Sequence, residues 1–396
     1  MESIVTRQMS ESRLARLRQN LASSTTEYDT VLIIGRVNQY YYTGTMQDGI
    51  LVLRKGGETF FFVRKSYERA RMESPFEPII RINTYRDMLE YLPANLGHVY
   101  VETEAVPVAM LERIRKYFQM DRILPLDRLI AAQRAVKTPE ELVLIRESAK
   151  RHADIMENTV PALLHEGMSE TDFAADLYAE MIKKGHHGVS RFSMFQMEII
   201  IGQFGFGETS LYPTNFDGPG GMKGMSPVVP ILGNRERLLK KGDLVFVDVG
   251  FGYMGYHSDK TQVYSFGAEP DELSNKTHRA CIHVLDRVVS GIRPGATPSV
   301  IYRESTADLP VELSQHFMGY GGEKVKFLGH GVGLFIDELP IISLGYKEPL
   351  CENMVIAIEP KCGVEGIGTV GVEETYIVGA NGAECITGGP RDIVRV

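Results

Sequence analysis

Two aspartates stand in a stretch that otherwise has the pattern of a buried hairpin, VFVDVGFGYMGYHSDKTQVY (245–264). Asp248 interrupts an apolar run, and Asp259 follows after a turn rich in glycine. A turn centred between Tyr253 and Met254 would place the two aspartates opposite each other, with Cβ atoms about 5 Å apart. Two buried carboxylates at that distance repel, so a proton or a cation must lie between them. A divalent metal ion is the simplest solution; the alternative is that Asp248 caps the turn and Asp259 faces solvent.

A second pair of acids occurs near the end of the chain, in MVIAIEPKCGVEGIGTVGVEETYIV (354–378). A central glycine lies midway between Glu359 and Glu373, which predicts that these residues also face each other across a hairpin. Between the two pairs, FLGHGVGLFIDELP carries His330 between glycines that permit close backbone approach. Four carboxylates and one imidazole can hold two divalent ions, and Mn²⁺, Co²⁺, Zn²⁺ and Fe²⁺ all accept such ligands.

The elements that must position these residues fall into two regions. Up to residue 133, short strand-like runs alternate with helical stretches, which predicts an α/β domain; the runs are VLIIG (31–35), GILVLR (49–54), TFFFVR (59–64) and HVYVE (98–102). From residue 134 two amphipathic helices precede strand-rich sequence, which predicts an α+β domain over 134–396. Thr138 with Glu141, and Ser169 with Asp172, form the capping boxes that predict the starts of those helices.

Composition excludes several classes of function. The 396 residues carry a net charge of −8, which leaves no basic surplus for binding nucleic acid. Apolar runs are too short to span a membrane, and the charged N-terminus lacks an apolar signal core, so we expect a cytoplasmic protein. The glycine-rich stretches match neither a P-loop nor a dinucleotide-binding turn.

The stretch 202–233 is rich in Gly and Pro and predicts a long ordered loop of the kind that borders a site. Tyr212, Asn215 and Asp217 are candidates for substrate contact because they lie in this loop. His186 and His187 follow a helix end, where interaction with the helix dipole accounts for them better than catalysis does.

The five metal-ligand candidates resemble the ligand set of the pita-bread metallopeptidase family, which includes prolidase, Xaa-Pro aminopeptidase, methionine aminopeptidase and creatinase. The resemblance covers nearly the whole chain. NQYYYTG (38–44) is similar to the N-terminal domain of prolidase and creatinase. The family's two Asp, one His and two Glu ligands match Asp248, Asp259, His330, Glu359 and Glu373.

The resemblance implies a fold and a mechanism. It implies a creatinase/prolidase-type N-terminal domain (1–133), a pita-bread catalytic domain (134–396) and a homodimer. Asp259 and Glu373 would bridge two divalent ions, Asp248 would bind one ion, and His330 and Glu359 would bind the other. A bridging hydroxide would attack a carbonyl while Glu359 shuttles the proton.

Three positions depart from the peptidase pattern. Ile231 or Leu232 stands where a peptidase histidine belongs, Asp337 replaces the histidine of HExP, and Gly371 replaces the arginine of RxED. Each lost donor is typically worth about 10²–10³ in rate. Asp337 is therefore a candidate catalytic and substrate-binding residue that would repel a substrate carboxylate and favour a cation or hydroxyl. The alternative is that Asp337 faces solvent or pairs with a lysine, for example Lys326 or Lys347.

These observations predict a metal-dependent hydrolase resembling Xaa-Pro dipeptidase or aminopeptidase that acts on a small peptide or amide. A second hypothesis is a pita-bread metalloenzyme that hydrolyses or lyases a small cationic or amine-bearing metabolite, since both peptidase histidines are absent. A binding protein with a vestigial site is a third, against which the five retained ligands count.

Overall fold

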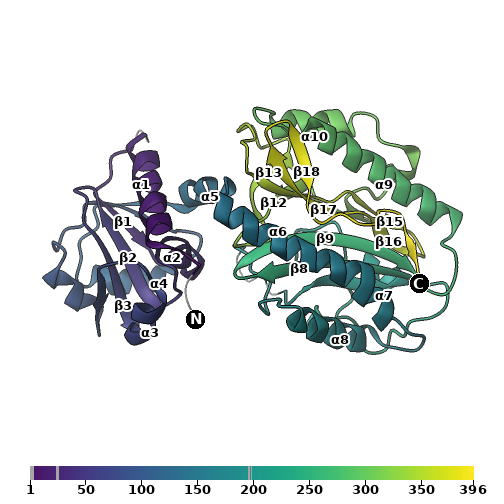
Figure 1. Ribbon diagram of the computed structural model, residues 1–396, viewed down its shortest axis with the longest axis horizontal. Coiled ribbons are helices and arrows are strands. Elements are labelled where there is room, and N and C mark those ends of the chain that lie inside the picture. The colour runs from purple at the N-terminus through teal and green to yellow at the C-terminus, as the bar shows by residue number, and fades with distance from the viewer. Residues whose placement is uncertain (1–3, 24–25, 195–196, 198) are drawn as a thin grey trace. The chain divides into compact units, whose positions relative to one another are not determined.

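The computed structural model describes residues 4–23, 26–194, 197 and 199–396, and the chain divides into two compact units, Met1–Gln133 and Arg134–Val396 (Figure 1). Each unit has its own apolar core, built on its own sheets. No helix among the described residues is long and apolar enough to cross a membrane.

The first unit is an α/β domain with a six-stranded mixed sheet in the order β4-β3-β2-β1-β5-β6, counted over its described part. Its strands are β1 (Thr30–Ile33), β2 (Asp48–Arg54), β3 (Thr59–Lys65), β4 (Ile79–Arg81), β5 (His98–Val101) and β6 (Arg122–Pro125). The helices are α1 (Arg7–Ser23), α2 (Arg36–Thr43), α3 (Tyr67–Glu73), η1 (Tyr85–Glu90), α4 (Val108–Arg115) and α5 (Asp127–Ala135). The four expected strands are present. The sequence pattern missed β4 and β6, because each has only two consecutive apolar residues beside an arginine and so gives almost no strand signal.

The described part of the second unit contains two main sheets. The first has the order β19-β9-β8-β7 and consists of β7 (Gly202–Phe206), β8 (Leu244–Tyr253), β9 (Tyr256–Ser265) and β19 (Val394–Arg395). The second has the order β13-β12-β14-β17-β18 and consists of β12 (Phe327–Gly331), β13 (Glu338–Ser343), β14 (Val355–Ile358), β17 (Glu374–Gly379) and β18 (Gly382–Cys385). Two-stranded ribbons are also formed by β10 (Gly319–Tyr320) with β11 (Glu323–Lys324), and by β15 (Lys361–Val364) with β16 (Gly368–Gly371).

Helices cover the outer faces of these sheets (Figure 1). On one side lie α6 (Pro139–Asp154), the π-helical turn η2 (Ile155–Thr159), α7 (Val160–Leu163) and α8 (Glu170–Lys183). On the other lie α9 (Glu272–Gly291), α10 (Pro298–Thr306) and η4 (Val311–Leu313). The capping boxes predicted at Thr138 and Ser169 are both formed, and they start α6 and α8.

The prediction of a loop over 202–233 is wrong for the first ten of these residues. Residues 202–206 form β7, and Gly207–Leu211 form the short 3₁₀ helix η3. The glycines of β7 give it no strand-like sequence pattern. They also allow it to lie close to β8, because a Cβ on Gly202 would be 2.1 Å from the carbonyl oxygen of Asp248. The chain from 212 to 243 is largely irregular, as predicted.

Candidate metal centre

The β8–β9 hairpin brings Asp248 and Asp259 onto one sheet face, but not directly opposite each other. Asp248 pairs with Thr261, and Asp259 pairs with Gly250. The prediction of a facing pair is wrong because the turn lies one residue later, at Met254 and Gly255. Both turn residues have positive φ, of 51° and 96°, as a two-residue hairpin turn of type I′ requires. The two carboxylates are therefore diagonal neighbours.

The second acid pair lies where two strand ladders meet. Ile358 pairs with Glu374 in the β14–β17 ladder, and Lys361 pairs with Gly371 in the β15–β16 ladder. Glu359 and Glu373 lie between these pairs, at the same level of the two chain segments, as the sequence predicts. The side chains of Glu359 and Glu373 are almost completely buried.

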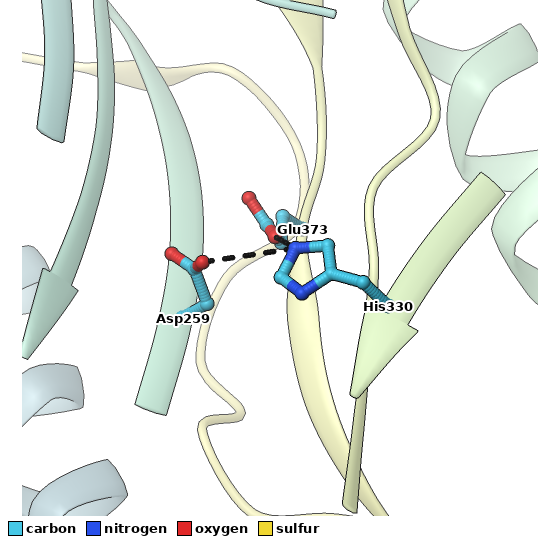
Figure 2. Close-up of side chains that lie close together, drawn as sticks. All are labelled: Asp259, His330 and Glu373. Carbon is cyan, nitrogen blue, oxygen red and sulfur yellow. Dashed lines mark ion pairs between the residues drawn. The ribbon is translucent and has the colours of Figure 1, made fainter. Parts of the chain in front are cut away.

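His330 joins Asp259 and Glu373 in a first group of potential ligands (Figure 2). Its Nε2 lies 3.9 Å from Asp259 Oδ2 and 3.9 Å from Glu373 Oε1. Asp259 comes from β9, His330 from β12 and Glu373 from the position just before β17, and the three side chains point toward one another. Glu373 Oε1 is buried and accepts no hydrogen bond from any described residue. A bound cation would stabilise a carboxylate oxygen in that situation, and the donor set of two carboxylates and one imidazole fits a divalent ion.

A second group of potential ligands, Asp248, Glu359 and Glu373, surrounds a lysine that the sequence interpretation overlooked. Lys361 Nζ donates to Asp248 Oδ2 at 2.8 Å, to Glu359 Oε2 at 2.8 Å and to Glu373 Oε2 at 2.9 Å. A signal for it was available, since residues two apart on extended chain point to the same side. Lys361 follows Glu359 by two residues and must share its face.

Burial and mutual repulsion shift the pKa values of these acids. Burial raises the pKa of Asp248 to about 6, against the opposing effect of the Lys361 ammonium. Burial also raises the pKa of Asp259 well above its usual range, and the charges of Glu373 and Asp248 raise it further. Although burial opposes ionisation of Glu359 as well, Lys361 and His330 outweigh it and lower the pKa of that carboxyl. A divalent ion at the first group would favour the ionised form of Asp259 and release its proton.

Asp337 contacts the candidate ligand His330. Its Oδ1 lies 3.0 Å from His330 Nδ1, on the opposite side of the ring from Nε2. A carboxylate at Nδ1 orients an imidazole so that Nε2 can bind a metal. The side chain of Asp337 retains 20% exposure, and burial raises its pKa to about 6. The structure thus pairs Asp337 with a histidine rather than with Lys326 or Lys347.

The neighbouring Glu338 fixes the loop that presents Asp337. Its buried carboxylate forms an ion pair with Arg134 and a second ion pair, at 3.2 Å, with Lys137 Nζ. It also accepts a hydrogen bond from the backbone N–H of Phe335 at 3.0 Å. Burial alone would raise the pKa of Glu338, but the two cations and this hydrogen bond lower it to about 2.

The loop candidates for substrate contact are all exposed. Asp217 is close enough to Glu359 and Asp337 for its charge to raise the pKa of Asp337, so it borders the centre. Tyr212 is 50% exposed and stacks under Lys223, and Asn215 is exposed. No contact of the described residues connects Tyr212 or Asn215 to the ligand groups, and their role in substrate binding stays a prediction.

The position where Ile231 or Leu232 replaces a peptidase histidine contributes no polar side chain to the centre. Ile231 and Leu232 pack against the apolar core beneath β7 and β8. His186 and His187 accept hydrogen bonds from the backbone near the hairpin turn: the N–H of Gly252 donates to His186 Nδ1 at 2.9 Å, and the N–H of Gly255 donates to His187 Nδ1 at 3.2 Å. These contacts account for both histidines structurally.

Comparisons with known proteins agree with this architecture. Residues 143–380 match the model of metallopeptidase family M24, and residues 13–136 match the creatinase/prolidase N-terminal domain. A Xaa-Pro dipeptidase from Pyrococcus furiosus is 27% identical over 371 residues, covering 92% of this chain and 95% of the relative.

Solved structures show the same fold. A prolidase from Pyrococcus horikoshii superposes with a TM-score of 0.80 at 22% identity, covering 97% of this chain and all of that one. The N-terminal domain of the FACT complex subunit SPT16 from chickpea also superposes, with a TM-score of 0.73 at 14% identity, 98% of this chain and 99% of that one. The pita-bread fold predicted from the sequence is therefore confirmed, and the chain belongs to metallopeptidase family M24, a family of metal-dependent hydrolases.

Proposed function

We propose that this protein is a metal-dependent hydrolase of a short peptide or small amide, and that residues 134–396 carry the chemistry. The observation that carries the proposal is the convergence of Asp259, His330 and Glu373 on one buried point, where Glu373 Oε1 has no donor. Two relatives, Xaa-Pro dipeptidases from Pyrococcus furiosus and Pyrococcus horikoshii, support the peptide substrate class.

In this proposal Asp259, His330 and Glu373 hold a divalent ion, which supplies Lewis acidity toward a carbonyl and acidifies water. Glu359 accepts and returns the proton. Its Oε1 lies 3.4 Å from His330 Nε2, while its Oε2 is held by Lys361. The contact with Lys361 fixes the Glu359 carboxylate and favours its anionic form, as a proton acceptor requires.

The acidic surroundings of the centre favour a second candidate, a small cationic or amine-bearing substrate. Asp337 and Asp217 add two carboxylates beside Glu359, and each raises the electrostatic cost of bringing in another anion. The free carboxylate of a dipeptide is such an anion. An amide that presents an amine to Asp337 is better suited to this charge distribution.

A substrate panel separates the two candidates. Metal-free protein is reloaded with Mn²⁺ or Co²⁺ and assayed on Xaa-Pro dipeptides, longer Xaa-Pro peptides and amides that carry an amine but no carboxylate. Turnover that disappears with chelator and in Glu359→Gln supports the hydrolase, with Glu384→Gln as an exposed control. If all peptides are inert and Asp337→His creates dipeptide turnover, the cationic-substrate candidate is favoured; inactivity on every class with metal bound contradicts the proposal.

A further inference from the structure

Lys361 lies at the centre of the second ligand group and has no solvent exposure. Its three contacts, at 2.8, 2.8 and 2.9 Å, go to one oxygen from each of Asp248, Glu359 and Glu373. A lysine ammonium has three N–H donors, so every donor is used on a carboxylate. These contacts are of the short, charge-assisted kind. The ammonium therefore takes the place that a metal ion coordinated by these three oxygens would take.

The backbone holds this lysine in position. Lys361 begins β15, where it pairs with Gly371, whose φ is 141°. A Cβ on Gly371 would lie 2.6 Å from Lys361 Cα and 2.9 Å from its Cγ. The absent side chain at 371 leaves the space through which the lysine stem runs. Because the stem is enclosed in this way, the ammonium cannot move to solvent as a surface lysine does.

The first ligand group, in contrast, contains no side-chain ammonium. Glu373 contributes one oxygen to each group: its Oε2 binds Lys361 and Thr261 Oγ1, whereas its Oε1 has no donor among the described residues. The centre thus contains one position filled by a side-chain cation and one position where a carboxylate oxygen still needs a cation.

We propose that Lys361 replaces one of two metal ions, so that the centre binds a single divalent ion per chain, at Asp259, His330 and Glu373. The inference rests on the proposed metal dependence. Charge balance agrees with this: Lys361 and one divalent ion place three positive charges against the four carboxylates, whereas Lys361 and two divalent ions would place five. A second divalent ion would have to share the oxygens of Asp248 and Glu359 with an ammonium of like charge.

Metal stoichiometry tests the inference without an activity assay. Protein loaded with excess Mn²⁺ and dialysed is analysed by plasma mass spectrometry and by electron paramagnetic resonance. We expect one ion per chain and a mononuclear, uncoupled Mn²⁺ spectrum. Lys361→Met removes the charge at similar length, so the variant should bind two ions and show exchange coupling. Lys276→Met, which removes a lysine paired with the carboxylate of Glu272 on the exposed face of α9, should stay at one ion.

Each outcome decides the matter. Two ions in the natural protein overturn the inference and leave the metal dependence intact, whereas no bound ion overturns the proposed function as well. A single ion in folded Lys361→Met shows that the lysine does not exclude the second metal. Should that variant fail to fold, anomalous diffraction from Mn²⁺-soaked natural protein decides: a peak between Asp259 and His330 supports the inference, and a peak between Asp248 and Glu359 overturns it.

Discussion

Glu338→Gln tests whether the buried ion pairs behind Asp337 hold the centre together. The glutamate side chain is 2% exposed and binds both Arg134 and Lys137. Glutamine has nearly the same shape as protonated glutamate, so the substitution removes the charge and little else. The loop from Phe335 to Glu338 depends on this carboxylate, because the N–H of Phe335 donates to it.

The magnitude follows from the pKa of Glu338, which falls from 4.5 to about 2 on folding. A lowered carboxyl pKa stabilises the folded state above the unfolded pKa, and the contribution disappears as pH falls through the folded pKa. The shift corresponds to about 3 kcal/mol of unfolding free energy at pH 7 and about 1 kcal/mol at pH 3. The difference between the natural protein and Glu338→Gln should therefore shrink between pH 5 and pH 2.

Urea unfolding of both proteins at pH 7 and pH 3, followed by a probe in the second unit, measures this difference. Glu384→Gln is the matched control, because Glu384 forms an ion pair with Arg146 at the surface and its loss should change the unfolding free energy by less than about 1 kcal/mol. A loss in Glu338→Gln below about 1 kcal/mol at pH 7, or one of equal size at both pH values, would refute the reasoning.

Three further predictions concern the centre itself. Mn²⁺ at about 100 times its Kd should raise the free energy of unfolding by about 2.7 kcal/mol, or the melting temperature by roughly 5–10 °C. Glu373→Gln should lose this shift in differential scanning fluorimetry, and an equal shift in the variant contradicts the ligand assignment. Asp337→Asn should weaken Mn²⁺ binding by about 10- to 100-fold in calorimetric titration, whereas Asp217→Asn, at an exposed carboxylate, should change it little. Gly371→Ala should destabilise the protein by more than about 2 kcal/mol in urea, since a Cβ there would be 2.5 Å from a carbonyl oxygen. Gly295→Ala, which has positive φ but open space around it, should cost only about 1–2 kcal/mol.

The sequence predicted which residues share the site better than it predicted how they pair. In the β8–β9 ladder Asp248 pairs with Thr261, two residues beyond the predicted partner Asp259, because the turn lies at Met254 and Gly255. A shift of two preserves the face of every side chain, whereas a shift of one would have turned Asp248 away. The spacing of polar residues therefore survives an error in turn position, while direct cross-strand pairing does not.

Long-range contacts were beyond the sequence pattern for a different reason. His330 Nδ1 meets Asp337 because the loop between them folds back. That fold depends on Glu338, which binds Arg134 and Lys137 from 204 and 201 residues away in the chain. No periodicity encodes such a contact. Lys361 is the opposite case: its position two residues after Glu359 is sufficient to place it on the same side as that acid, but the sequence analysis overlooked it.

The fold alone does not decide the chemistry, because the FACT subunit domain has the same fold at 14% identity. The centre must be judged by its charges. Here the acids that could hold two ions are retained, yet one group of three already surrounds an ammonium, and Gly371 provides the space that the lysine needs. Lys361 and Gly371 therefore act as a unit: restoring a side chain at 371 without removing the lysine should break the β15–β16 pairing, and removing the lysine alone should leave its three carboxylate partners in need of a second ion.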